Sequence, residues 1–263
     1  MKRVLRGDGT ALLPWVIPIA LLVAWQVLGG SSRTGRALPA PTDILVAGAR
    51  LIRSGELFHH AWVSLERALL GLALGGGVGL LLGLANGYWP IAERVFDTPV
   101  QMARNVPHLA LIPLVILWFG LGEPSKVFLV ALGVLFPIYL NTLHGVRSLD
   151  PGLLEMARLY GLGPLALFRQ VILPGALPSI LVGLRFALGV MWLSLIVAET
   201  IATDAGIGYL AMNAREFMQT DVVVLSIILY ALLGKGADVA ARAAERRLLQ
   251  WDTRYLRRVA PAT

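Results

Sequence analysis

Long runs without a formal charge set the hydrophobic pattern of this 263-residue chain. Four of these runs contain 24, 25, 18 and 20 residues, and they cover 9–32, 68–92, 105–122 and 127–146. A bilayer core is crossed by about 20 mostly apolar helical residues. Each of the four runs therefore predicts a membrane-spanning helix.

Two further runs, 186–198 and 222–234, contain only 13 uncharged residues each. Alone, they would suit the core helices of a soluble domain. Beside four predicted spans, we interpret them as spans whose flanking charges reach the membrane surface or face protein. The expected fold is an all-α polytopic membrane protein with about six transmembrane helices.

The composition narrows the class of protein further. Hydrophobic residues make up 57% of the chain, charged residues make up 15%, and the mean hydropathy is +0.71. Because an average soluble domain is about a quarter charged, an ordinary soluble globule is excluded. The same composition excludes a disordered protein, because so apolar a chain buries its hydrophobic residues. The sequence has no cysteine, which excludes disulfides and thiol chemistry, and we expect neither a metal nor a cofactor.

The N-terminal sequence resembles a secretory signal, because Lys2, Arg3 and Arg6 precede an apolar stretch. That stretch, 11–28, is longer than a typical signal-peptide core, and no A-x-A motif follows it directly. We therefore expect residues 1–29 to form a cytoplasmic tail and an uncleaved first span.

Basic residues predict the orientation in the membrane. With the N-terminus in the cytoplasm, 16 of the 23 Lys and Arg residues lie inside and 7 lie outside, as the positive-inside rule favours. The exception is 30–67, which places five arginines outside and is expected to form periplasmic or interfacial helices. The predicted location is a bacterial inner membrane, with both termini, including the basic tail 236–263, in the cytoplasm.

Glycine recurs at every fourth position within the second run. The residues are Gly71, Gly75, Gly79, Gly83 and Gly87. Such a stripe of small residues lets another helix approach closely, either within the chain or at a subunit interface. None of these glycines belongs to a phosphate-binding loop, because the GxxxxGK[ST] pattern is absent. We do not expect this chain to bind ATP itself.

Four polar side chains inside the predicted spans are candidates for lining or gating a solute pathway: His108, Asn141, Ser194 and Glu199. His108 lies between Pro107 and Pro113, which predict a kink, and it could instead cap a helix. Asn141 could instead bond to backbone or headgroups. Glu199 is expected at the outer boundary, as a gate, a contact for a partner protein or an interfacial anchor.

The segment 147–178 is a long connection that keeps an apolar face. Asp150 is expected to cap a helix that begins at Pro151 and ends at Gly161 in a left-handed turn. A second short helix is expected over 165–172. Three helix-breaking residues should separate it from the fifth span: Pro174, Gly175 and Pro178. The apolar face predicts that another protein covers this segment.

The same segment carries a family motif. Glu155, Met156 and Ala157 are followed after three residues by Gly161, and after nine more by V-I-L-P, which ends at Leu173 and Pro174. This spacing resembles the EAA loop of ATP-binding-cassette importer permeases, with Met156 in place of the usual alanine. The segments 105–120, 173–199 and 206–224 resemble the nitrate/taurine/sulfonate branch, and most closely its permeases for aliphatic sulfonates.

The resemblance implies a type I importer permease with a five-helix core over 68–235 and an added N-terminal span. In that family, the EAA loop is the coupling helix that docks onto a cytoplasmic ATP-binding-cassette ATPase. Two permeases pair, two ATPases bind to them, and a periplasmic or extracellular solute-binding protein delivers the solute. The chain would then be a translocation subunit rather than an enzyme, with ATP hydrolysed by its partner.

Other functions remain open at this stage. A secondary transporter would show repeated halves and ionisable groups at the midplane, and we find no repeat. An intramembrane enzyme could use Ser194 or Ser226, but no recognisable motif surrounds either residue. Within the importer class, taurine and nitrate remain alternatives to aliphatic sulfonates.

Overall fold

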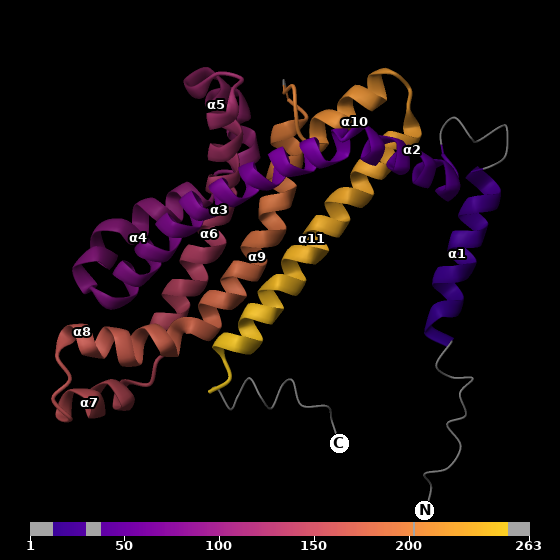
Figure 1. The fold of residues 1–263 in the computed structure, drawn as a ribbon. Helices are drawn as coiled ribbons and strands as arrows, with labels where there is room; N and C mark the ends of the chain where they lie inside the picture. The colour runs from indigo at the N-terminus through magenta and orange to yellow at the C-terminus, as the bar shows by residue number, and fades with distance from the viewer. Residues whose placement is uncertain (1–12, 30–37, 202, 252–263) are drawn as a thin grey trace, which may run out of the picture.

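Helices form all the regular structure of residues 13–29, 38–201 and 203–251, the part of the chain that this computed structural model describes (Figure 1). The α-helices are α1 (Leu13–Gly29), α2 (Pro41–Ser54), α3 (Glu56–Tyr88), α4 (Pro90–Arg104), α5 (Ile112–Phe119), α6 (Glu123–Arg147), α7 (Pro151–Leu159), α8 (Pro164–Leu167), α9 (Leu173–Glu199), α10 (Ile207–Glu216) and α11 (Thr220–Leu248). A 3-10 turn, His108–Leu111, precedes α5, and a π-helical turn, Phe168–Ile172, precedes α9.

Among the described residues, four helices are long and apolar enough to cross a membrane: α3, α6, α11 and a helix that continues from Pro164 to Glu199. A fifth span results if α4 and the segment His108–Phe119 are counted together, although the two are bent by 80°. Of the first predicted span, Trp15–Gly29 forms a shorter apolar helix. The all-helical membrane fold is therefore confirmed, and the two 13-residue runs lie in long helices.

The run 105–122 differs from the single span expected there. Residues 105–107 interrupt the helical path, and only the 3-10 turn and the eight-residue α5 follow before Gly120. The kink predicted from the prolines is therefore confirmed. Its physical cause is that Pro107 removes a backbone N–H donor and disfavours the α conformation of Val106.

The α6 helix forms the centre of the core, with α3 on one side and α9 on the other. The glycine stripe of α3 faces α6 within the same chain. A Cβ atom added at Gly83 would lie 2.6 Å from Thr142 Cβ, and one added at Gly87 would lie 2.6 Å from Val146 Cβ. At Gly75 an added Cβ would meet the carbonyl of Ala131. The missing side chains thus bring the two backbones into close approach.

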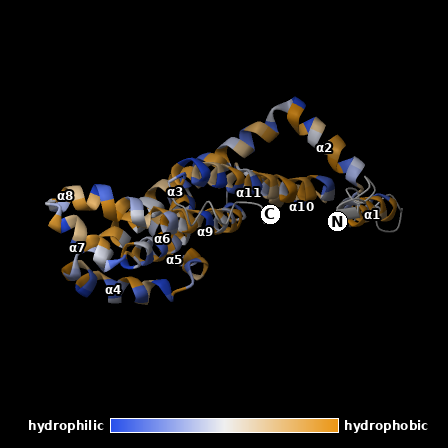
Figure 2. Cartoon of the chain, turned by 90° about the horizontal axis from the view of Figure 1, so that it is seen from below, coloured by the Kyte–Doolittle hydropathy of each residue, from blue (hydrophilic) through white to orange (hydrophobic). Residues whose placement is uncertain are grey.

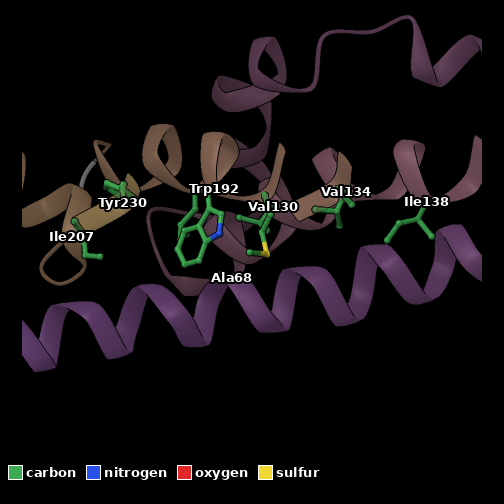
Figure 3. Packing of buried hydrophobic residues seen from close by; sticks show 10 residues of the cluster. Ala68, Val130, Val134, Ile138, Trp192, Ile207 and Tyr230 are labelled. Carbon is green, nitrogen blue, oxygen red and sulfur yellow. The ribbon is translucent and has the colours of Figure 1, made fainter. Parts of the chain in front are cut away.

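Buried apolar side chains join the long helices into one core (Figure 3). Those labelled in the figure are Ala68 of α3, Val130, Val134 and Ile138 of α6, Trp192 of α9, Ile207 of α10 and Tyr230 of α11. These residues come from five helices, so α10 and α11 pack on the same core as α3, α6 and α9.

The α1 and α2 helices lie at the edge of this core. Hydrophilic and hydrophobic residues alternate along α2 in Figure 2, and α2 buries Ala47 and Leu51 against α10 and α11. The α1 helix contacts α2, and its Trp25 Nε1 donates a hydrogen bond of 3.0 Å to the carbonyl of Pro39, which precedes α2. Figure 1 shows α1 standing apart from the other long helices. Within the expected interfacial segment 30–67, α2 packs on the core, and the part from Glu56 onward belongs to α3.

Candidate functional site

The α7–α8 loop, residues 148–172, projects from the end of the core where α6 finishes (Figure 1). Asp150 caps α7 by accepting a hydrogen bond of 2.9 Å from the Gly152 N–H, and Pro151 occupies the first helical position. The helix start predicted from these residues is confirmed. It arises because the carboxylate satisfies an N–H that has no partner within the helix.

Gly161 ends α7 with φ of 81°, so the predicted left-handed turn is also confirmed. The following Leu162 N–H reaches back to the Ala157 carbonyl at 3.2 Å, which is the six-residue closure of a Schellman motif. A Cβ at Gly161 would have no atom within 4 Å, so the glycine is needed for its backbone angle rather than for space inside this chain.

One face of the α7–α8 loop packs on the core. A buried apolar cluster contains Ala157 of α7, Leu167 of α8, Ile172 and Ala176 near the start of α9, and Val146 of α6. This cluster packs the loop against the ends of two membrane-spanning helices, α6 and α9.

The opposite face of the loop carries exposed apolar side chains. Leu159 is 88% exposed and Tyr160 is 80% exposed, while Met156 and Leu165 are exposed beside them. Glu155 is also exposed, and it makes no ion pair with any described residue. Among the motif residues, Glu155, Met156 and Gly161 therefore lie on the free face, whereas Ala157 points into the core.

The second half of the loop continues directly into a membrane helix. The expected break at Pro174, Gly175 and Pro178 is wrong, because α9 includes all three residues. Pro174 lies in the first turn of α9, where a missing N–H costs little, and the π-helical turn Phe168–Ile172 accommodates the change in hydrogen bonding. Leu173 and Pro174 are thus part of the span rather than of a separate connector.

A group of polar and charged residues, buried except for Glu123, lies at the opposite end of α9 from the loop. We call it the charged cluster, and its members are Ser64, Arg67, Glu123, Lys126, Glu199 and Tyr230. It joins α3, α6, α9 and α11. Arg67 and Lys126 balance the two glutamates, so the cluster carries no net charge.

Glu199 is the most enclosed member, with no exposed surface. Its carboxylate accepts hydrogen bonds from Ser64 Oγ at 2.8 Å, Arg67 Nη1 at 2.8 Å, Tyr230 Oη at 2.8 Å and the Gly208 N–H at 2.9 Å. These four donors compensate for the loss of hydration of the carboxylate. Because no part of Glu199 reaches the surface, two of its expected roles are wrong, the interfacial anchor and the direct contact for a partner protein.

Arg67 connects Glu199 to other elements. Its guanidinium forms a two-point ion pair with Glu123 at the start of α6 and donates a 2.7 Å hydrogen bond to the Ala205 carbonyl. Sequence reasoning missed this role, because Arg67 and Glu123 served only as the ends of uncharged runs. Arg67 is buried rather than exposed on the outer surface, so one of the five arginines in 30–67 is neutralised inside the protein.

Two of the four predicted pathway residues meet in the middle of the core. His108 Nε2 lies 2.9 Å from Ser194 Oγ. Gly133 of α6 makes room for the contact, because a Cβ there would lie 2.5 Å from Ser194 Oγ and 3.1 Å from His108 Nε2. Asn141 is apart from them and donates to the Pro137 carbonyl of its own helix at 2.8 Å. In the described part of the chain, no group of three or more His, Asp or Glu side chains could hold a metal ion.

The structure is a bundle of apolar helices from which the α7–α8 loop projects with an exposed apolar face. This arrangement fits the membrane subunit of a transporter that is driven by a partner protein. Residues 75–250 match the family model described as binding-protein-dependent transport system inner membrane component, and the chain belongs to that family. It is thus a multi-pass permease subunit of the inner membrane, and the ATPase is a separate subunit.

The chain is similar to named members of this family. It is 60% identical over 92% of its length to the aliphatic sulfonates transport permease protein SsuC of Escherichia coli (strain K12), and it covers 92% of that protein. It is 35% identical to the taurine transport system permease protein TauC of the same organism, over 89% of this chain and 87% of that protein.

Solved structures of the class share the fold. A crystal structure of an amino acid ABC transporter matches 77% of this chain and 96% of that chain, with a TM-score of 0.61 at 19% sequence identity. At that identity the match is evidence for the fold alone, which it supports over most of the core.

Proposed function

We propose that this permease subunit imports aliphatic sulfonates. The observation that carries this proposal is the 60% identity to SsuC over 92% of both chains, compared with 35% to the taurine permease TauC. An alkanesulfonate combines one delocalised negative charge with an apolar tail. Taurine and nitrate are the competing solutes within the same class.

The proposed assembly contains two copies of this chain, a pair of ATPases and a solute-binding protein. The α4 helix supports pairing of two copies. None of its residues is buried within this chain, and two of its apolar side chains are largely exposed: Ile91 by 76% and Met102 by 69%. An apolar surface on a helix that also carries Glu93, Arg94 and Asp97 fits an interface with protein better than a lipid-facing surface.

Coupling to the ATPase is proposed to occur at the free face of the α7–α8 loop. The exposed apolar side chains there, with Glu155 and Gly161 beside them, provide a surface that a groove on the ATPase can cover. Nucleotide binding would favour one of two arrangements of the permease pair through its different contacts with the loop in each arrangement. This placement requires the loop and both chain termini to lie in the cytoplasm.

Solute uptake into liposomes tests the proposed function. The permease, the ATPase and the binding protein would be purified together, reconstituted, and supplied with ATP inside the liposomes and a radiolabelled alkanesulfonate outside. We expect ATP-dependent uptake that an excess of alkanesulfonate abolishes and that equal nitrate does not. Uptake of taurine or nitrate in preference to a simple alkanesulfonate would replace the proposed solute.

A further inference from the structure

The chain is irregular between α4 and α5, directly before His108, whose side chain reaches the middle of α6. Residues 105–107 are exposed in the chain and connect two segments bent by 80°. The neighbouring His108 contacts the region of Gly133, which is 10 residues from Glu123 and 14 from Arg147, the two ends of α6. At 1.5 Å per residue, Gly133 is about 15 Å from one end of α6 and about 21 Å from the other.

Non-helical backbone at this depth has only two stable environments. It is either enclosed in protein or in contact with a water-filled cavity, because lipid offers no hydrogen-bonding partner. Residues 105–107 are not enclosed by this chain, so in the assembled transporter the surface around the interruption contacts the paired copy or an aqueous space rather than lipid. Broken helices with this exposure line the solute path in other transporter folds.

The hydrogen bond to Ser194 determines which imidazole nitrogen of His108 carries a proton. Ser194 Oγ is fully buried and has no other hydrogen-bonding partner among the described residues. A buried hydroxyl that only accepted would leave its own hydrogen unsatisfied. Ser194 therefore donates to Nε2 of the neutral ring, which places the ring hydrogen on Nδ1.

His108 Nδ1 consequently carries an N–H in both protonation states. In the neutral ring Ser194 fixes the hydrogen there, and in the protonated ring both nitrogens carry one. Nδ1 has no partner in the described part of the chain and is not among its enclosed polar atoms. The ring thus keeps a hydrogen-bond donor, unpaired among the described residues, in both protonation states.

We infer that His108 Nδ1–H contacts an oxygen of the organic oxyanion as the solute passes through the membrane, with Ser194 as the positioning residue. This inference rests on the proposed function, whose solute has three oxygen atoms that accept hydrogen bonds and none that donates. A donor that persists in both protonation states suits such a group. The exposed Leu114 and Leu117 of α5 lie farther along the same segment and offer an apolar surface for the alkyl tail.

The functional test compares two variants with a matched control in the reconstituted transporter. His108→Phe keeps an aromatic ring but removes the donor, and Ser194→Ala frees the tautomer. Ser226→Ala is the control, because Ser226 is also fully buried but donates to the Val222 carbonyl of its own helix at 2.9 Å.

We expect His108→Phe to reduce the rate of alkanesulfonate uptake by about tenfold or more, as the loss of a hydrogen bond to a charged group predicts. Its ATPase should still copurify, and the loaded binding protein should still stimulate ATP hydrolysis. Ser194→Ala should give a smaller decrease, and Ser226→Ala should match wild type. Wild-type uptake by His108→Phe would overturn the inference.

A spectroscopic measurement on the wild-type protein covers the case in which His108→Phe does not fold. The chain has four histidines, so ¹⁵N-histidine solid-state NMR with His108→Gln for assignment can isolate one ring. We expect a protonated Nδ1 and an unprotonated Nε2 in the neutral ring, and a shift of the Nδ1 signal when alkanesulfonate is added. An Nε2–H tautomer, or no shift at saturating solute, would overturn the inference.

Failure of the proposed function would look different. If the wild-type transporter carries another oxyanion but no alkanesulfonate, the sulfonate assignment fails. Uptake of that oxyanion by the same variants and by wild type then still tests the role of His108.

Discussion

Arg67 Nη1 lies 2.8 Å from Glu199 Oε1, and the two side chains are 3% and 0% exposed. They come from positions 132 residues apart in the sequence. A buried ion pair is costly to break, because removing one partner leaves an uncompensated charge in a region of low dielectric. The pair therefore connects α3 to the end of α9 more firmly than a surface pair could.

Replacing Glu199 should destabilise the whole core. Glu199→Gln leaves Arg67 without one carboxylate and places an amide N–H₂ group against four donors. We expect a loss of about 3–5 kcal/mol of stability, seen as a lower thermal midpoint and folded yield in detergent. The matched control is Glu93→Gln, which breaks an exposed 2.7 Å pair with Arg147 and should cost about 1 kcal/mol or less. Equal midpoints for the two variants would contradict this account.

The glycine stripe gives a second prediction about stability. Gly79→Leu should separate α3 from α6, because a Cβ at Gly79 already meets the Leu135 carbonyl. Gly77→Leu is its control, since a Cβ at Gly77 has no atom within 4 Å. We expect folded yield by size-exclusion chromatography to fall strongly for the first variant and little for the second. A well-folded, active Gly79→Leu protein would refute the close-packing role.

The turn after α7 should respond to its backbone angle. Gly161→Ala forces a side chain into the left-handed region and should cost about 1 kcal/mol. Gly163→Ala should be neutral, because Gly163 has φ of −65° and open space around it. Proteolysis within the loop should be faster in Gly161→Ala alone. Identical digestion of both variants would show that the turn tolerates the strain.

Docking of the ATPase should depend on side chains that this chain does not use for its own stability. Leu159→Ser removes an apolar group that is 88% exposed, so the folded yield should stay at the wild-type level. We expect ATPase copurification at matched membrane levels to fall by about tenfold if Leu159 is a central contact. Glu155→Lys should have a similar effect by reversing a charge on the same face. Full recovery of the ATPase with both variants would place the coupling surface elsewhere.

Cysteine labelling tests the orientation in a chain that has no native cysteine. The exposed positions Ser54 and Ser148 are suitable sites for single cysteines. An impermeant maleimide applied from outside should label Ser54→Cys in intact cells and Ser148→Cys only after permeabilisation. The opposite result would place the α7–α8 loop on the wrong side for an ATPase.

Local and periodic features of this fold were readable from the sequence. The uncharged runs predicted the positions of the long helices. A capping aspartate, a proline at the first helical position and a left-handed glycine predicted the α7 helix of the α7–α8 loop. Each of these signals lies within a few residues of the structure it specifies, so no knowledge of tertiary packing was needed.

The charged cluster could not be read in the same way. Arg67 is 56 residues from Glu123 and 132 from Glu199, and charges at the ends of apolar runs usually face water or headgroups. Only the packing of α3 between its neighbours shows that these charges neutralise one another. The α4 helix was likewise not predicted, because Glu93, Arg94 and Asp97 lie between two uncharged runs and interrupt the apolar pattern.

The continuous helix from Pro164 to Glu199 has a mechanical consequence. Figure 1 shows the α8 part of this helix at an angle to α9, and the 27 residues of α9 alone extend about 40 Å at 1.5 Å per residue. One end belongs to the loop that faces the proposed ATPase, and the other ends in the carboxylate that Arg67 and Tyr230 hold. No linker intervenes between these two ends, so we expect a tilt imposed at the loop to be transmitted through one helical element toward Glu199.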